Sequence, residues 1–160
     1  MDEPFGALDP ITRSDIRKEF LELPELKRKT ILLVTHDVLE AFELGDQISL
    51  MDRGRIIQSG PPQELVFKPV NDFVGNFFSH QKLQLELSSL TLCGIWDTLP
   101  YTELENGVPL AINATFWEAL ERLSENKRAS LTIRESDTNS LKSVTFENVM
   151  SAYLRIKQNR

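Results

Sequence analysis

The stretch TILLVTHD at residues 30–37 decides the fold class of the first half of the chain. Residues 30–34 form a continuous apolar run bounded by charge, which is typical of a parallel strand buried on both faces. Asp37 and Glu40 form the pattern of a capping box that opens a short helix, and Gly45 is expected to end that helix. A buried strand followed directly by a capped helix predicts an α/β fold.

Around this stretch the sequence predicts one helix before it, and a hairpin and two short helices after it. The first helix is expected to begin near residue 12 or 14 and to be ended or kinked by Pro24. A three-residue hairpin loop, residues 52–54, is expected to place Gly54 at positive φ. The other expected elements are strands 48–51 and 55–58 and short helices that begin at Pro61-Pro62 and at Asn71.

The second half predicts the element order β-α-β-β-α. Its expected elements are strand 108–112, a helix opened by a capping box at residues 115–118, strands 131–133 and 141–145, and a final helix to about residue 157. Residues 81–107 are expected to be a linker. Thr145 is expected to cap the last helix, with a hydroxyl contact to a ribose as the alternative.

The composition excludes several classes of protein. With 160 residues, 41% hydrophobic and 26% charged, the chain is large enough for one domain or two small ones. No apolar run approaches the ~18 residues of a membrane span, and the acidic, turn-rich start does not have the pattern of a signal peptide. The net charge of −6 at pH 7 argues against nucleic acid as a partner.

The remaining side chains of interest have simple structural interpretations. The single cysteine, Cys93, excludes an internal disulfide framework, fits a reducing compartment, and is expected to be a buried small hydrophobe. Trp96 and Trp117 are expected to be core or interface aromatics. The basic side chains near residues 12–29 are expected to form a solvated helix surface; they are Arg13, Arg17, Lys18, Lys27, Arg28 and Lys29.

The first nine residues, MDEPFGALD, carry the candidate catalytic groups. Asp2 and Glu3 are adjacent carboxylates, and neighbours at the end of a strand point in different directions, so one could hold a metal while the other faces a substrate water. Taken alone, the pair is more simply explained as solvated charge. His36, taken alone, is more simply explained as a structural histidine at a strand-to-helix turn.

Together, DEPFGALDP at residues 2–10 and VTHD at residues 34–37 resemble the ATP-binding subunits of ABC transporters. Asp2-Glu3 resembles the end of the Walker B strand, residues 7–9 the D-loop, and His36 the switch histidine. The resemblance covers about residues 1–78. The segments GALDPITR (residues 6–13) and VLEAFELGD (residues 38–46) are most similar to the sequences of importers of glycine betaine, choline and related osmoprotectants.

The resemblance implies a role for each of these side chains. Asp2 would hold Mg²⁺ through water, and Glu3 would polarise the attacking water as general base. His36 would contact the γ-phosphate of ATP, and Asp9 would lie at the interface of an ATPase dimer. The implied partners are a second ATPase subunit and a transmembrane permease. The implied location is cytoplasmic, peripheral on the inner face of the cell membrane, with membrane contact only through the permease.

Two motifs of this family do not occur in the sequence. There is no Gly-x-x-x-x-Gly-Lys-[Ser/Thr] P-loop and no Leu-Ser-Gly-Gly-Gln signature. Because P-loop amides and the P-loop lysine cradle the triphosphate, the isolated chain is predicted not to hydrolyse ATP. Met1 stands where the Walker B strand has its last apolar residue, which suggests a truncated gene product or an internal start.

The order β-α-β-β-α in residues 108–157 resembles one CBS (cystathionine-β-synthase) motif. Residues 143–145 read SVT where that family commonly has a glycine, so nucleotide sensing does not follow from the resemblance.

The expected fold is α/β: the C-terminal part of a P-loop NTPase core (RecA-like, ABC-type) in residues 1–80, the linker, and a small α+β CBS-like module in residues 108–160. The alternative functions are a non-catalytic regulatory or dimerisation module and a degenerate remnant.

Overall fold

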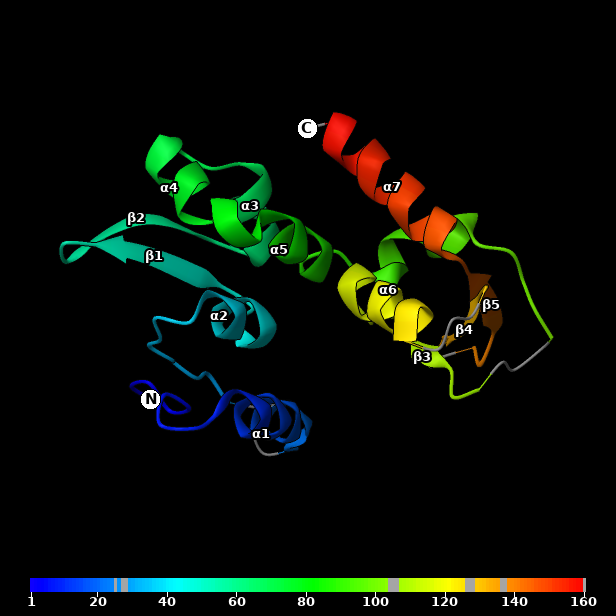
Figure 1. Cartoon of the computed structure of the whole chain (residues 1–160), viewed down its shortest axis with the longest axis horizontal. Coiled ribbons are helices and arrows are strands. Elements are labelled where there is room, and N and C mark those ends of the chain that lie inside the picture. The colour runs from blue at the N-terminus through cyan, green and yellow to red at the C-terminus, as the bar shows by residue number, and fades with distance from the viewer. Residues whose placement is uncertain (25, 27–28, 104–106, 126–128, 136–137, 160) are drawn as a thin grey trace. The chain divides into compact units, whose positions relative to one another are not determined.

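The computed structural model describes the chain except for residues 25, 27–28, 104–106, 126–128, 136–137 and 160. The chain divides into two compact units, Met1–Pro62 (unit 1) and Gln63–Arg160 (unit 2) (Figure 1). Among the described residues, no helix has the length and apolar character needed to cross a membrane.

Unit 1 consists of two helices and a hairpin. Its elements are α1 (Pro10–Glu22), α2 (Val38–Leu44), β1 (Ile48–Asp52) and β2 (Arg55–Gly60). Helix α1 begins slightly earlier than predicted, because the Asp9 carboxylate accepts hydrogen bonds from the N–H groups of Ile11 and Thr12 and a proline follows it. The helix ends before Leu23, as expected for the residue that precedes Pro24.

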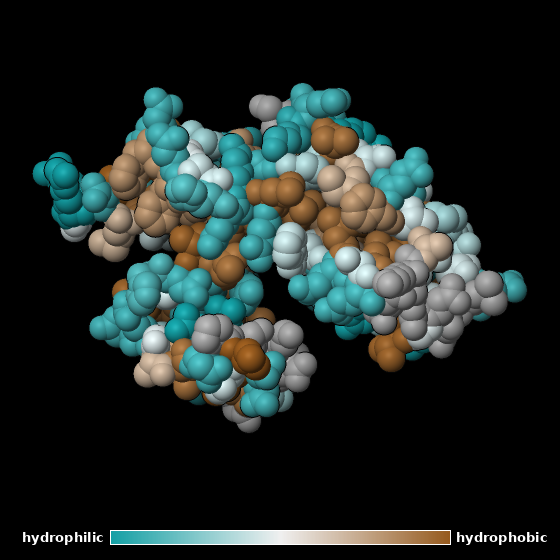
Figure 2. Space-filling view, viewed as in Figure 1, coloured by the Kyte–Doolittle hydropathy of each residue, from teal (hydrophilic) through white to brown (hydrophobic). Residues whose placement is uncertain are grey.

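Residues 30–34 do not form the predicted buried strand. Their sheet-like contact is a single parallel bridge between Asp2 and Val34. Leu32 is 80% exposed and Val34 is 54% exposed. The prediction is therefore wrong for this structure, because a strand is buried on both faces only when strands flank it and helices cover it. Within the described residues only residues 1–3 pair with it, and further apolar surface is exposed around α1 (Figure 2).

The predicted hairpin of β1 and β2 is confirmed, with a shorter loop and a second strand that continues to Gly60 instead of ending at residue 58. Asp52 pairs with Arg55, so the loop contains two residues instead of three. Arg53 and Gly54 have φ values of 46° and 75°, as a type I′ turn requires. The predicted positive φ at Gly54 is confirmed.

Unit 2 contains a small mixed sheet with two long helices, preceded by a series of short helices (Figure 1). The elements are α3 (Pro62–Phe67, whose first residue is the last of unit 1), α4 (Asp72–Phe77), η2 (Ser79–Gln81), α5 (Lys82–Ser88), η3 (Leu92–Thr98), β3 (Leu110–Ala111), α6 (Phe116–Glu125), β4 (Leu131–Arg134), β5 (Leu141–Val144) and α7 (Phe146–Gln158). Strand β3 pairs parallel with β4, which pairs antiparallel with β5. The order β3-α6-β4-β5-α7 is the predicted one.

The described residues of the segment 81–107, which was predicted to be a linker, supply part of the core of unit 2. Several apolar side chains of this segment pack into the same cluster as Phe116, Ile133 and Val149, which are fully buried. The buried members from this segment are Leu87, Leu90, Leu92, Ile95 and Leu99. Burial of Leu87 in α5 and of Leu92 and Ile95 in η3 makes the segment part of the fold instead of a connection.

The predicted cap of the last helix is confirmed. The Thr145 hydroxyl accepts a hydrogen bond from the Asn148 N–H at 3.2 Å, and the Asn148 side chain accepts one from the Thr145 N–H at 3.0 Å. This reciprocal pair is a capping box with asparagine in place of the more usual glutamate or glutamine. The hydroxyl of Thr145 is thereby committed to the helix end.

The predictions for the two tryptophans of unit 2 are confirmed, and the prediction for its cysteine is wrong. Trp96 and Trp117 are half-buried and pack against the core. Trp96 also contacts Lys142, whose ammonium donates a hydrogen bond to the Trp96 carbonyl at 2.8 Å and lies 4.8 Å from the ring centroid. Cys93 is exposed and not buried, because it lies on η3 between Leu92 and Ile95, which take the inward positions.

Candidate functional site

Glu3 and His36 meet in unit 1, although 33 residues separate them in the sequence. Glu3 Oε1 lies 2.7 Å from His36 Nδ1. The bridge between Asp2 and Val34 causes this meeting, because it aligns the residues that follow each of them. The two side chains are 49% and 75% exposed, so the pair faces solvent. Two of the predicted catalytic side chains are thus in direct contact.

The contact changes the acid–base behaviour of His36. The hydrogen bond that His36 donates to the Glu3 carboxylate, and next the negative charge of that carboxylate, hold the pKa of His36 above its ordinary value of 6.5. A solvent-facing carboxylate that is hydrogen-bonded to an imidazole can orient a water molecule and accept its proton. The arrangement therefore fits general-base chemistry on a water molecule.

A tight turn fixes the backbone of Glu3. Its φ is 41°, in the left-handed region that residues other than glycine rarely adopt. The N–H of Gly6 donates to the Glu3 carbonyl at 3.1 Å and closes the turn. A Cβ atom at Gly6 would lie 3.3 Å from Glu3 Oε2, closer than most such contacts. The absence of a side chain at Gly6 therefore leaves room for the Glu3 carboxylate.

Asp2 and Asp9 have different surroundings from the Glu3–His36 pair. Asp2 is exposed at the bridge, next to Glu3. No group of three or more potential metal-ligating side chains occurs among the described residues. Mg²⁺ is usually held by one or two carboxylates, water and substrate phosphates, so an exposed single aspartate fits that mode of binding. Asp9 caps α1, and its hydrogen bonds, first with the Thr12 side chain, lower its pKa.

Two arginines of α1 contact the turn around residues 36–37, which the sequence analysis missed. Arg13 donates to the Asp37 carboxylate at 3.3 Å and to the Leu8 carbonyl at 2.9 Å. Arg17 is largely buried, 3.0 Å from the Glu43 carboxylate. The prediction of a solvated surface is wrong for these two, because acidic side chains of α2 and its cap face them. Their separation of four residues places them on one helix face, the signal that could have found them.

Among the other basic residues near α1, the structure describes the side chain of Lys29. Lys29 is exposed, as predicted. Lys27 and Arg28 lie outside the described residues, as does the side chain of Lys18.

The cap of α2 is confirmed, but its second predicted member has another role. Asp37 Oδ1 accepts hydrogen bonds from the N–H groups of Leu39 and Glu40 at 3.0 and 3.2 Å. Glu40 is buried and hydrogen-bonded to Thr35, and its burial raises the pKa of its carboxyl group. Glu40 therefore belongs to the packing beneath residues 35–37 and not to a reciprocal capping box.

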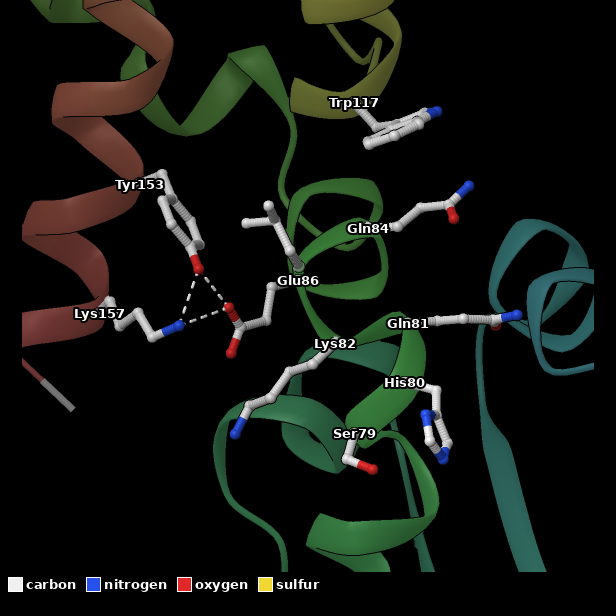
Figure 3. A pocket seen from close by; sticks show the side chains of 10 residues that line it. Ser79, His80, Gln81, Lys82, Gln84, Glu86, Trp117, Tyr153 and Lys157 are labelled. Atoms are coloured by element: carbon white, nitrogen blue, oxygen red, sulfur yellow. Dashed lines mark hydrogen bonds and ion pairs between the residues drawn. The ribbon is translucent and has the colours of Figure 1, made fainter.

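Unit 2 has its own cluster of titratable groups, which no local sequence pattern indicated. Tyr153 donates to the buried carboxylate of Glu86, and the Lys157 ammonium donates to Glu86 Oε2 at 2.9 Å and to the Tyr153 hydroxyl at 2.8 Å (Figure 3). Burial raises the pKa of Tyr153, and the hydrogen bonds that Lys157 donates to Tyr153 and Glu86 raise the pKa of Lys157.

The Glu86–Tyr153–Lys157 cluster lines a hollow of about 540 Å³. Figure 3 shows Tyr153 and Lys157 on one side of α5 and His80 and Gln81 on the other, so the lining side chains do not converge on one point. The cluster therefore acts as a link between α5 and α7. Its buried carboxylate needs these partners, because an unpaired charge would be costly in such a place.

Comparison with known proteins finds ATP-binding proteins of osmoprotectant transport systems among the relatives of this chain. The chain is 36% identical over 137 residues to the osmoprotectant import ATP-binding protein OsmV of Salmonella typhimurium, which covers 86% of this chain and 34% of that protein. It is 42% identical over 120 residues to the glycine betaine uptake system ATP-binding protein YehX of Escherichia coli, with 75% and 38% covered. No family model matches the chain.

A third relative matches the chain from end to end. The glycine betaine/carnitine/choline transport ATP-binding protein OpuCA of Bacillus subtilis is 36% identical over 165 aligned residues, which cover 100% of this chain and 39% of that protein. The chain spans between a third and two fifths of the length of these curated relatives. The comparisons confirm the resemblance that the motifs predicted.

Proposed function

We propose that this chain, a homologue of the C-terminal segment of osmoprotectant ABC-transporter ATP-binding proteins, provides the general base and the switch histidine of an ATP-hydrolysing importer subunit. The contact between Glu3 and His36 carries the proposal, because two side chains that the motif assigns to one reaction lie 2.7 Å apart. The names of the relatives support a quaternary-amine osmoprotectant, such as glycine betaine or choline, as the transported solute.

Each residue of the site has a defined task in this proposal. Glu3 accepts the proton of the attacking water, and its hydrogen bond to His36 keeps the carboxylate oriented toward that water. His36, whose imidazole is held in the protonated form to a higher pH by Glu3, contributes positive charge near the γ-phosphate. Asp2 is the residue that would hold Mg²⁺ through water. Bound Mg²⁺ would supply charge neutralisation on the phosphates of ATP.

Hydrolysis in this proposal requires a P-loop and a signature motif from outside these 160 residues, since neither occurs within them. Two ATPase subunits would come together with Asp9 at their interface, and the dimer would bind a transmembrane permease on the cytoplasmic side of the membrane. We assign residues 1–80 to the ATPase part, which resembles a Walker B–D-loop–switch segment. The order β3-α6-β4-β5-α7 supports a CBS-like module in residues 108–160.

Uptake by cells tests the proposal as a whole. A chimera in which this chain replaces the matching segment of OpuCA should restore glycine betaine uptake to Bacillus subtilis cells that lack OpuCA and other betaine uptake systems. A Glu3→Gln chimera should fold and be produced at the same level but should not restore uptake. A Glu19→Gln chimera is the matched control, because Glu19 is an exposed glutamate on α1. Equal uptake with Glu3→Gln would favour the non-catalytic regulatory module instead.

A further inference from the structure

We infer that Arg13 is a positioning residue for the Glu3–His36 pair, because its guanidinium ties the turn that follows Glu3 to the helix cap that follows His36. The inference rests on the proposed function only for the use of this pair in ATP hydrolysis. The geometry that supports it lies entirely within unit 1.

One end of the guanidinium holds the turn after Glu3. Arg13 Nη2 donates to the Leu8 carbonyl at 2.9 Å and to the Gly6 carbonyl at 3.4 Å. The same turn is closed by two backbone hydrogen bonds, from Gly6 to Glu3 and from Leu8 to Phe5, each 3.1 Å long. Arg13 therefore fixes the chain between Glu3 and Asp9 from outside the turn.

The other end of the guanidinium holds the residue that follows His36. Arg13 Nη1 donates to Asp37 Oδ2 at 3.3 Å. Asp37 is already fixed by its other oxygen, Oδ1, which caps α2 through the N–H groups of Leu39 and Glu40. The planar fork of an arginine can reach both places at once, whereas a lysine ammonium is a single point charge on a flexible stem.

The pair needs such a support because its own contacts are weak. The side chains of Glu3 and His36 are largely exposed, and exposed ion pairs hold their geometry poorly. The backbones beside them are joined by the Asp2–Val34 bridge, with hydrogen bonds of 2.8 Å from Glu3 to Val34 and 2.9 Å from Val34 to Met1. Arg13 adds a second connection, because it contacts the Leu8 carbonyl in the turn after Glu3 and the Asp37 carboxylate after His36. The backbone is therefore held on both sides of the Glu3–His36 pair.

Nuclear magnetic resonance of the two histidines of the full chain tests this inference. The acid–base titration of His36 is followed by its ring-proton shifts in the wild type and in the Arg13→Lys, Arg13→Gln and Glu3→Gln variants. The charged groups that act on His36 are Glu3, Asp37 and Arg13 itself. If Arg13 positions the pair, both Arg13 variants should lower the pKa of His36 by most of the amount that Glu3→Gln lowers it.

The sign of the effect separates positioning from simple electrostatics. The positive charge of Arg13 alone lowers the pKa of His36. Arg13→Gln removes that charge, so it should raise the pKa of His36 if the Glu3–His36 pair does not move. Arg13→Lys keeps the charge and should then leave the titration unchanged. Either of these outcomes would overturn the inference.

A control and a second assay keep the results interpretable. The His80 signals, which come from unit 2, and the far-ultraviolet circular dichroism should be the same in all variants. If Arg13→Gln unfolds unit 1, the inference is tested by the conservative Arg13→Lys variant. The inference stands if the pKa of His36 falls in the Arg13 variants while the OpuCA chimera hydrolyses no ATP, and in that case it is the proposed function that fails.

Discussion

Replacement of Leu92 by alanine tests whether residues 81–107 belong to the core of unit 2. Leu92 is 0% exposed and packs in the same cluster as Leu90, Ile95 and Phe116. The change removes three carbon atoms, which corresponds to about 2.4 kcal/mol at ~0.8 kcal/mol per buried carbon. A cavity that remains in a packed core adds to this loss, so we expect the free energy of unfolding to fall by about 3–4 kcal/mol.

Urea denaturation followed by tryptophan fluorescence measures this loss, because the two tryptophans of the chain, Trp96 and Trp117, both pack against that core. Leu83→Ala is the matched control, since it removes the same atoms from a neighbouring helix where the side chain is 53% exposed. It should cost about 1 kcal/mol or less. A loss for Leu92→Ala no greater than that for Leu83→Ala would show that the segment is a linker and would refute the reasoning.

Three further predictions concern unit 2. The pKa values of Tyr153 and Lys157 are raised above 10.0 and 10.5, so the folded state holds these protons more tightly. Their stabilisation should be complete below about pH 10 and should decline as the pH rises through the folded pKa values. Urea midpoints that stay constant as the pH rises above about 10 would contradict this. Thr145→Ala should lower the free energy of unfolding by about 1 kcal/mol, whereas Thr145→Ser should retain most of it; equal losses in the two variants would argue against the cap. Cys93 is exposed, so its thiol should react with Ellman's reagent in the folded protein nearly as fast as in urea, and strong protection would restore the prediction of a buried cysteine.

The sequence predicted the features that depend on neighbouring residues. Asp37 and Thr145 cap their helices because a side-chain oxygen needs only the N–H groups two or three positions further on. Gly54 takes a positive φ because the hairpin turn requires it. Residue spacing alone does not predict the contact of Glu3 with His36. The resemblance to ABC-transporter ATP-binding proteins implies one site for both residues, and their side chains are in contact in the structure.

The features that the sequence did not predict depend on distant parts of the chain. An apolar run such as residues 30–34 has the composition of a buried strand, but its burial depends on neighbours that the run itself does not specify. Helix α5 has no side-chain cap at its first residue, so the usual signal of a helix start is missing in the predicted linker. Glu86 lies 67 and 71 residues from its partners Tyr153 and Lys157, which no local pattern can connect.

The ATP turnover of the OpuCA chimera tests the central claim most directly. Purified with its permease in lipid, the chimera should hydrolyse ATP, and Glu3→Gln should reduce kcat by about 10²-fold or more with the fold and ATP binding retained. The control Glu19→Gln should leave kcat unchanged. A Glu3→Gln chimera that hydrolyses ATP as fast as the parent chimera would contradict the assignment of Glu3 as the general base, and with it the account of this site.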